Sequence, residues 1–194
     1  MGMVDLTPPL RRATAADAAA LADLINMAGE GLPHYFWQEM AEEGDDPWEL
    51  GRRRQAKKAE QGQVFVVDEG AGASAALTGY QTPGVPVVIA DDDPPMFRPM
   101  QELENLALSS WYVNVLATYP EQRGRGHGSR LLGLAEDIAR ELGLSEMSII
   151  VADQNTGARR LYQRTGYIET ARRAMIKEDW QCDSNQWVML IKQL

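Results

Sequence analysis

The chain has 194 residues, of which 44% are hydrophobic, and it carries a formal net charge of −9. This length suffices for one well-buried core, and no shift in composition marks a second domain, so we expect a single domain over residues 1–194. The excess of negative charge argues against general binding to nucleic acid or to anionic membranes. It favours a cationic partner, such as an amine.

The sequence also bears on the cellular compartment. Cys182 is the only cysteine, so no disulfide can form within the chain. No neighbouring histidine or motif marks this thiol as a nucleophile, and an ordinary thiol is the simpler interpretation. The N-terminus lacks a basic-then-apolar leader, and no apolar run approaches about 18 residues. We therefore expect a cytoplasmic protein.

The first part of the chain predicts a short strand and two helices. Residues 10–13 can pair as a strand, but the two prolines before them cannot, because proline has no N–H group to donate. Thr14 and Asp17 have the spacing of a capping box, and the apolar residues after them recur on one helical face, which predicts a helix ending near Gly29. A later helix is expected to begin with Pro47, because proline is favoured in the first helical turn.

Residues 32–40 are the most aromatic stretch of the chain, and we expect them to pack a short helix onto the core. The charged residues within 39–58 are typical of a solvated face, with an acidic lip for a cationic substrate as the alternative. Two apolar runs, 63–68 and 73–81, flank a glycine-rich turn. They predict a hairpin of antiparallel strands.

Residues 82–99 contain several prolines and an acidic triplet, so we expect a long loop there, apart from a short strand at 87–89. Long loops in compact domains are often functional lids, and we place this one beside the substrate site. In the next segment, 101–108, Glu102 and Glu104 would share one face of a strand but would diverge on a helix. The sequence leaves both arrangements open.

The clearest pattern begins with the apolar run 111–117, which reads as a central strand covered on both faces. A basic loop follows, in which Gly124, Gly126 and Gly128 alternate, and then a helix that ends at Gly143. Alternate glycines leave backbone N–H groups open to an anion at the positive end of a helix. The spacing matches neither the dinucleotide motif nor the mononucleotide P-loop.

The second half continues as strand, helix and further strands. A strand, a helix and a strand in this order imply a right-handed parallel crossover. Asn155 is a favourable helix N-cap. The predicted elements are a strand at 147–151, a helix from Asn155 to Arg164, a strand beginning at Tyr167, and strands at 173–177 and 186–192.

The loop Arg123-x-x-Gly126-x-Gly128, between an apolar strand and a helix, resembles the pyrophosphate-binding motif of the GNAT superfamily of acyl-CoA-dependent N-acetyltransferases. Asn155 and the segment 161–167 resemble that family's second signature. The resemblance implies an α+β (α/β GNAT-like) fold: a mixed, mostly antiparallel central sheet with a splayed parallel strand pair and helices on both faces. It also implies that the first half of the chain forms the acceptor side and 111–167 the acyl-CoA-binding core.

The resemblance further implies a site for acetyl-CoA as acyl donor, without a metal ion. The loop amides and arginines would hold the pyrophosphate, the end of the central strand would pair with the pantetheine arm, and Asn155 would contact that arm. The implied cofactor-binding residues are Val115, Leu116, Ala117, Arg123, Gly124, Arg125, Gly126, His127, Gly128, Ser129, Asn155 and Tyr162.

Two residues are implied for proton transfer. Tyr162 matches the family tyrosine that acts as general acid toward the departing thiolate, and a phenol stays neutral at pH 7. The alternative for Tyr162 is packing against the cofactor or the core. An amine must also lose a proton before attack, and Glu104 is our candidate base, with Glu102, Asp92 and water as alternatives.

The sequence therefore predicts an N-acetyltransferase that moves an acetyl group from acetyl-CoA to a primary amine by direct attack in a ternary complex. The alternative is a GNAT-fold acyl-CoA-binding or regulatory module with little catalysis. His34, Tyr35 and Trp37 fall in the region that covers the acceptor pocket in this family, so they are candidates to line it. The acceptor is a small molecule or a protein amine, no nucleic acid or membrane partner is expected, and a homodimer stays open.

Overall fold

The computed structural model describes Val4 and residues 6–194. Within this range the chain divides between two units, each assembled from segments distant in sequence. The N-terminal unit holds the described residues up to Gly79 together with Val115–Leu134, and the C-terminal unit holds Tyr80–Asn114 and Ala135–Leu194. The chain thus passes from one unit to the other within strands and within a helix. The single domain expected from composition stays a prediction.

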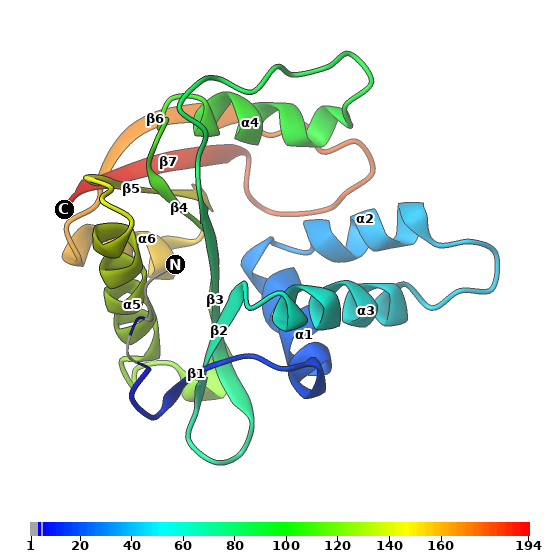
Figure 1. Cartoon of the computed structure of the whole chain (residues 1–194). Coiled ribbons are helices and arrows are strands. Elements are labelled where there is room, and N and C mark those ends of the chain that lie inside the picture. Colours follow the sequence, from blue (N-terminus) through cyan, green and yellow to red (C-terminus); the bar gives the residue numbers. More distant parts are fainter. Residues whose placement is uncertain (1–3, 5) are drawn as a thin grey trace. The chain divides into compact units, whose positions relative to one another are not determined.

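The N-terminal unit combines three helices with an antiparallel hairpin, as its sequence predicts. Figure 1 shows the helices lying side by side. Asp46 caps the third helix by accepting the Trp48 N–H at 2.9 Å. The elements are β1 (Leu10–Arg12), α1 (Ala18–Ala28), α2 (Leu32–Met40), α3 (Pro47–Glu60), β2 (Val64–Asp68) and β3 (Ala73–Gln81), with β1 antiparallel to β2 and β2 antiparallel to β3.

The aromatic stretch forms α2, which confirms the packing interpretation of that segment. Trp37 is buried, with 3% of its surface exposed, and its ring lies against Gly51 of α3. A Cβ atom at Gly51 would come within 2.4 Å of the ring, so only glycine fits at this point of α3. His34 stacks on Trp48 with 4.6 Å between ring centroids. These rings therefore join α2 to α3.

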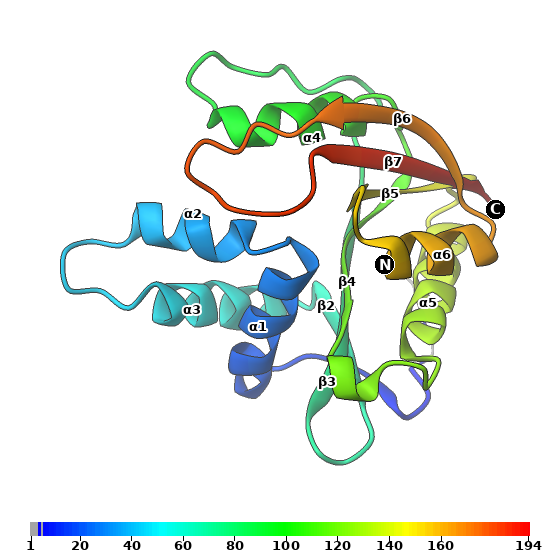
Figure 2. The same cartoon turned by 180° about the vertical axis from the view of Figure 1, so that it is seen from behind.

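The C-terminal unit is built on strands of both orientations. Figure 2 shows β7 between β5 and β6, and both views draw α4 on one side of these strands and α6 on the other. The elements are α4 (Arg98–Glu104), β4 (Trp111–Thr118), α5 (His127–Glu141), β5 (Glu146–Ala152), α6 (Thr156–Arg164), β6 (Ile168–Ala174) and β7 (Gln186–Gln193). The last four residues of β4 and the start of α5 belong to the N-terminal unit.

The strand pairing confirms the predicted fold class. β4 is parallel to β5, with Trp111 opposite Met147 and Val113 opposite Ile149, whereas β5, β7 and β6 pair antiparallel. Seven strands in all form the mixed, mostly antiparallel arrangement, in the order β1-β2-β3 at one end and β4-β5-β7-β6 at the other. Tyr119, directly after β4, donates its N–H to the Ser74 carbonyl of β3 at 3.1 Å. The splay of the parallel pair stays a prediction.

Three sequence predictions are settled or corrected by the structure. Residues 87–89 form no strand, because the Val87 backbone is engaged by the Asn105 side-chain amide instead of by a neighbouring strand. The segment with Glu102 and Glu104 is the helix α4, so these carboxylates diverge. Residues 173–177 are not a separate strand: β6 runs unbroken from Ile168 to Ala174, since no turn residue interrupts it.

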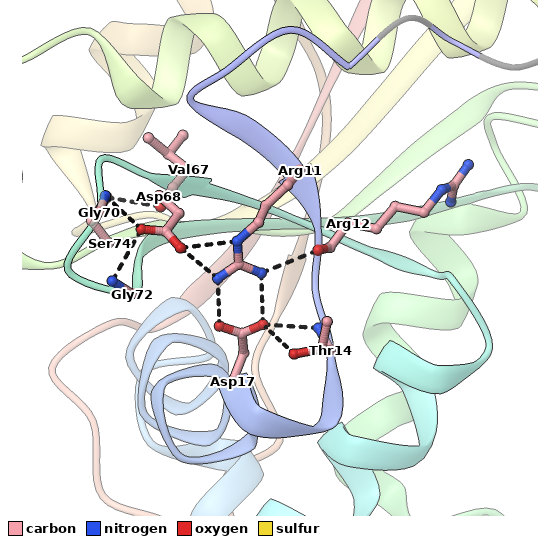
Figure 3. Close-up of polar contacts among 9 residues, drawn as sticks. All are labelled: Arg11, Arg12, Thr14, Asp17, Val67, Asp68, Gly70, Gly72 and Ser74. Carbon is pink, nitrogen blue, oxygen red and sulfur yellow. Dashed lines mark hydrogen bonds and ion pairs between the residues drawn. The ribbon is translucent and has the colours of Figure 1, made fainter.

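An ion cluster ties the start of the chain to the hairpin (Figure 3). The Arg11 guanidinium binds both Asp17 carboxylate oxygens at 2.8 Å and the Asp68 Oδ2 at 2.8 and 2.9 Å. Asp17 is 7% exposed, and it also accepts the Thr14 N–H at 2.8 Å. The hydrogen bonds from Arg11 are the main reason that the pKa values of both carboxyls lie below their ordinary value.

We expect Asp17→Asn to lower the free energy of unfolding by about 2 kcal/mol, because it leaves a charged hydrogen bond unmade at a buried position. Urea unfolding of the purified protein measures this change. The matched control is Glu49→Gln, which removes one carboxylate from the exposed pair with Arg52 and should change stability by less than about 0.5 kcal/mol. Equal losses in the two variants would contradict a special role for the cluster.

The cluster should also make stability depend on pH. A carboxyl with a folded-state pKa below its unfolded value of about 3.9 stabilises the fold above that pH, and loses this contribution as pH falls through the folded-state pKa. The stability difference between wild type and Asp17→Asn should therefore be full near pH 6 and shrink below about pH 4. Urea unfolding across this range tests the sign, and a difference that grew at low pH would refute it.

Candidate functional site

The glycine-rich loop lies between β4 and α5, in the strand, loop and helix order that its sequence predicts. Gly124 and Gly126 have φ angles of +78° and +82°, in the left-handed region that side chains rarely adopt. A Cβ atom at either position would meet no other atom of the described residues within 4 Å. The backbone conformation, and not crowding by the protein, therefore calls for glycine there. Gly128 and the exposed Ser129 lie in the first turn of α5. The backbone N–H groups of a first helical turn have no partner within the helix and can bind an anion.

The two loop arginines point to different partners. Arg123 donates from Nε to the Thr118 carbonyl at 3.3 Å and from Nη2 to the Met27 sulfur at 3.5 Å. Arg125 instead forms an ion pair with Glu69 at 2.5 Å and a hydrogen bond with the Gln122 side chain. Both arginines are exposed, so their charges are available to a ligand.

His127 differs from the rest of the loop because it is buried, with 3% of its surface exposed. Its Nε2 atom has no hydrogen-bond partner among the described residues. A buried polar nitrogen without a partner is uncommon in folded proteins. The sequence marked His127 only as part of the motif, whereas the structure shows that its side chain lies inside the fold.

The end of β4 alternates between core and surface. The side chains of Val115 and Ala117 are buried in the core of the N-terminal unit, beside Leu21 and Leu24 of α1, and Leu116 is half-buried. The side chains of these predicted cofactor contacts are thus used in packing. Any contact with a ligand falls to their backbone groups.

Helix α1 also reaches the region of the loop, which the sequence did not indicate. Tyr119 donates its hydroxyl to the Ala20 carbonyl and to Asp23, each at 3.3 Å. Burial, with the nearby Asp23, raises the pKa of Tyr119 to about 12. Met27 of the same helix contacts Arg123. No local motif signals these contacts, because they join residues nearly a hundred positions apart.

In the C-terminal unit, Tyr162 is 3% exposed on α6, with its ring 5.9 Å from that of Tyr167. Burial raises the pKa of Tyr162 above its ordinary value, so the phenol is neutral and keeps its proton at pH 7. Asn155 caps α6 by accepting the Ala158 N–H at 3.2 Å, as predicted. The arrangement provides a protonated donor on a fixed helix.

Glu104 lies at the C-terminal end of α4 and is partly buried. Tyr80 donates its hydroxyl to Glu104 Oε2 at 2.8 Å, and the Tyr80 ring lies edge-on to Tyr112 at 5.3 Å. Burial raises the pKa of Glu104, although the hydrogen bond from Tyr80 partly opposes this. Tyr112 is fully inside the fold, and burial is the main reason that its pKa lies well above the ordinary value, with a smaller contribution from Glu104.

A buried hydroxyl cluster fixes α4 beside the end of β3. Thr82 donates from Oγ1 to the Ala107 carbonyl at 2.6 Å, and the hydroxyls of Ser110 and Ser148 are 2.7 Å apart. Thr82 follows Tyr80 by two residues, and Ala107 follows Glu104 by three. The cluster thereby joins the segment that follows Tyr80 to the segment that follows Glu104.

The alternative bases from the sequence lie in different surroundings. Glu102 is 47% exposed and forms an ion pair with Arg173 at 2.7 Å. Asp92 is exposed in the loop before α4. Glu104 alone of these three is both partly buried and raised in pKa, which is the usual condition for a catalytic base near neutral pH.

Comparison with known proteins identifies the family. The model of the acetyltransferase (GNAT) family matches residues 34–167, more than half of the chain. The uncharacterized N-acetyltransferase YycN of Bacillus subtilis (strain 168) is 36% identical over 59 residues, which are 30% of this chain and 38% of the relative. No helix of the described residues is long and apolar enough to cross a membrane.

Solved structures agree with this fold. A ribosomal-protein-alanine N-acetyltransferase from Brucella melitensis shares 20% identity, with 95% of this chain and 99% of that chain covered, at a TM-score of 0.58. An agmatine N-acetyltransferase shares 15% identity, with 95% and 98% covered, at a TM-score of 0.62. The family match and the fold together show that this chain belongs to the GNAT acetyltransferase family.

Proposed function

We propose that the protein transfers an acetyl group from acetyl-CoA to a primary amine by direct attack in a ternary complex. The observation that carries this proposal is the partly buried Glu104 carboxylate, raised in pKa and hydrogen-bonded to Tyr80. It shares its unit with the neutral, buried Tyr162. An acceptor of protons and a donor of protons are the two groups that aminolysis of a thioester needs.

Each step of the proposed reaction is assigned to a group of the protein. Glu104 takes a proton from the ammonium form of the acceptor, and the neutral nitrogen then attacks the thioester carbonyl carbon. The second proton that the nitrogen loses on becoming an amide passes to water. A backbone N–H at the end of β4, among Val115, Leu116 and Ala117, stabilises the oxyanion. As the carbon–sulfur bond breaks, Tyr162 gives its proton to the thiolate.

The N-terminal unit holds the acyl donor in this proposal. The amides from Gly124 to Ser129 bind the pyrophosphate, helped by the charge of Arg123 and by the positive end of α5. A Cβ atom at Gly124 or Gly126 would meet no other atom of the described residues within 4 Å, so an anion can approach the amides at these positions. Asn155 is the residue that the family's second signature assigns to the pantetheine arm.

Two observations favour an amine as the acceptor. The chain carries a net charge of −9, which attracts a cationic substrate. Related proteins carry the names of N-acetyltransferases, including one for agmatine. Tyr80, whose ring lies edge-on to that of Tyr112, is hydrogen-bonded to the Glu104 carboxylate, and an aromatic ring beside a carboxylate suits an ammonium group before its deprotonation.

We expect Glu104→Gln and Tyr162→Phe each to lower kcat by about 10²-fold, because each removes a proton-transfer group. Acceptor-dependent release of free CoA, measured with a panel of primary amines, tests this. The rate of the wild type should rise with pH as Glu104 loses its proton, and this rise should vanish in Glu104→Gln.

The control for these variants is Glu102→Gln, which removes an exposed carboxylate from the same helix and should change kcat by less than about twofold. A large loss in this control would assign the base to Glu102. Tight binding of acetyl-CoA without acceptor-dependent CoA release would instead favour an acyl-CoA-binding module.

We also expect Gly126→Ala to weaken acetyl-CoA binding about tenfold, equivalent to about 1.4 kcal/mol, because the methyl group enters the ligand space and the left-handed backbone resists it. The matched control is Gly133→Ala within α5, where a Cβ atom also meets open space but the backbone is helical. That change should leave affinity unaltered. Isothermal titration calorimetry measures both, and equal affinities for all three proteins would place the donor elsewhere.

A further inference from the structure

The turn between β2 and β3, residues 69–72, is held rigidly. Asp68 Oδ1 accepts the N–H groups of Gly70 and Gly72 at 2.8 and 3.0 Å, while its Oδ2 is bound by Arg11 (Figure 3). Glu69 follows Asp68 directly, so its backbone is fixed by this cluster. The backbone of the turn is therefore held at Asp68, and the Glu69 side chain extends from it with 39% of its surface exposed.

Arg125 of the glycine-rich loop meets that carboxylate. Its Nη2 lies 2.5 Å from Glu69 Oε2, and its Nη1 donates to the Gln122 side chain. Arg123, two residues earlier, binds the Thr118 carbonyl and Met27 instead. The two arginines are therefore not equivalent: Arg125 extends toward the hairpin turn, whereas Arg123 folds back on the strand that precedes the loop.

We propose that Glu69 is a resident counter-ion for Arg125, and that Arg125 exchanges this partner for the 3′-phosphate of coenzyme A when the donor binds. This inference rests on the proposed function, and it adds a residue that selects among donors. The loop amides remain the binding group for the pyrophosphate. Glu69 thus sets how strongly the protein prefers a donor that carries the additional phosphomonoester.

The exposure of the pair makes the exchange easy. The side chains of Arg125 and Glu69 are 50% and 39% exposed, and ion pairs of this kind contribute little to stability. A phosphomonoester carries a charge of about −1.5 to −2 at pH 7 and offers three acceptor oxygens, so it binds a guanidinium more strongly than one carboxylate does. A planar guanidinium also suits the paired oxygens of a phosphate.

The test compares acetyl-CoA with acetyl-3′-dephospho-CoA by isothermal titration calorimetry. Arg125→Gln should weaken acetyl-CoA about tenfold, as expected for a lost charge-assisted contact, and leave the dephospho compound nearly unchanged. Glu69→Gln should strengthen acetyl-CoA about two- to fivefold, because no ion pair has to open. The double variant should match Arg125→Gln, since Glu69 acts only through Arg125. Arg123→Gln, the matched control, should affect both compounds alike.

Equal changes for the two donors in Arg125→Gln would overturn the inference, because they would place Arg125 on the pyrophosphate or on no phosphate. Weaker acetyl-CoA binding in Glu69→Gln would overturn it as well. These results differ from a failure of the proposed function itself, in which the wild type would bind neither donor and both proposals would fall together.

Discussion

The structure depends on one strand that serves two units. Trp111 to Val113 pair with β5 in the C-terminal unit, whereas Val115 and Ala117 are part of the core of the N-terminal unit. A strand with this double task must be apolar on both faces, which is what the run 111–117 provides. The same strand also connects, along the chain, the residues proposed for proton transfer to the loop proposed for the acyl donor. Tyr112 belongs to the same unit as the proposed acid and base, and the glycine-rich loop begins a few residues beyond the end of the strand.

Two partly buried carboxylates show how the surroundings separate a structural role from a chemical one. Asp17 is held by a guanidinium, so its pKa falls and its charge is permanent near neutral pH. Among the described residues, Glu104 accepts a hydrogen bond from the Tyr80 phenol and forms no ion pair, so burial dominates and its pKa rises. A paired carboxylate stabilises the fold, whereas one left without a cation can exchange a proton.

The features that the sequence predicts well are local. Alternate glycines, the Asn155 cap and the proline at the start of α3 depend on neighbours within a few residues, and all take the expected conformation. The contacts that distinguish Glu104 are not local: Tyr80 lies 24 positions earlier, and its approach depends on the buried hydroxyls of Thr82 and Ser110. The family motif predicts the donor site. The sequence leaves the conformation of residues 101–108 open, and it is the helix α4 that leaves Glu102 exposed and Glu104 partly buried.

The contact of Gly51 with Trp37 couples the substitutions that these two positions can accept during evolution. Any side chain at residue 51 collides with the indole, so a larger residue there is tolerated only if residue 37 becomes smaller in the same lineage. Glycine in the middle of a helix costs about 1 kcal/mol relative to alanine, and here that cost is offset by the burial of a large aromatic ring. In related sequences, we expect a residue larger than glycine at position 51 to occur together with a residue smaller than tryptophan at position 37.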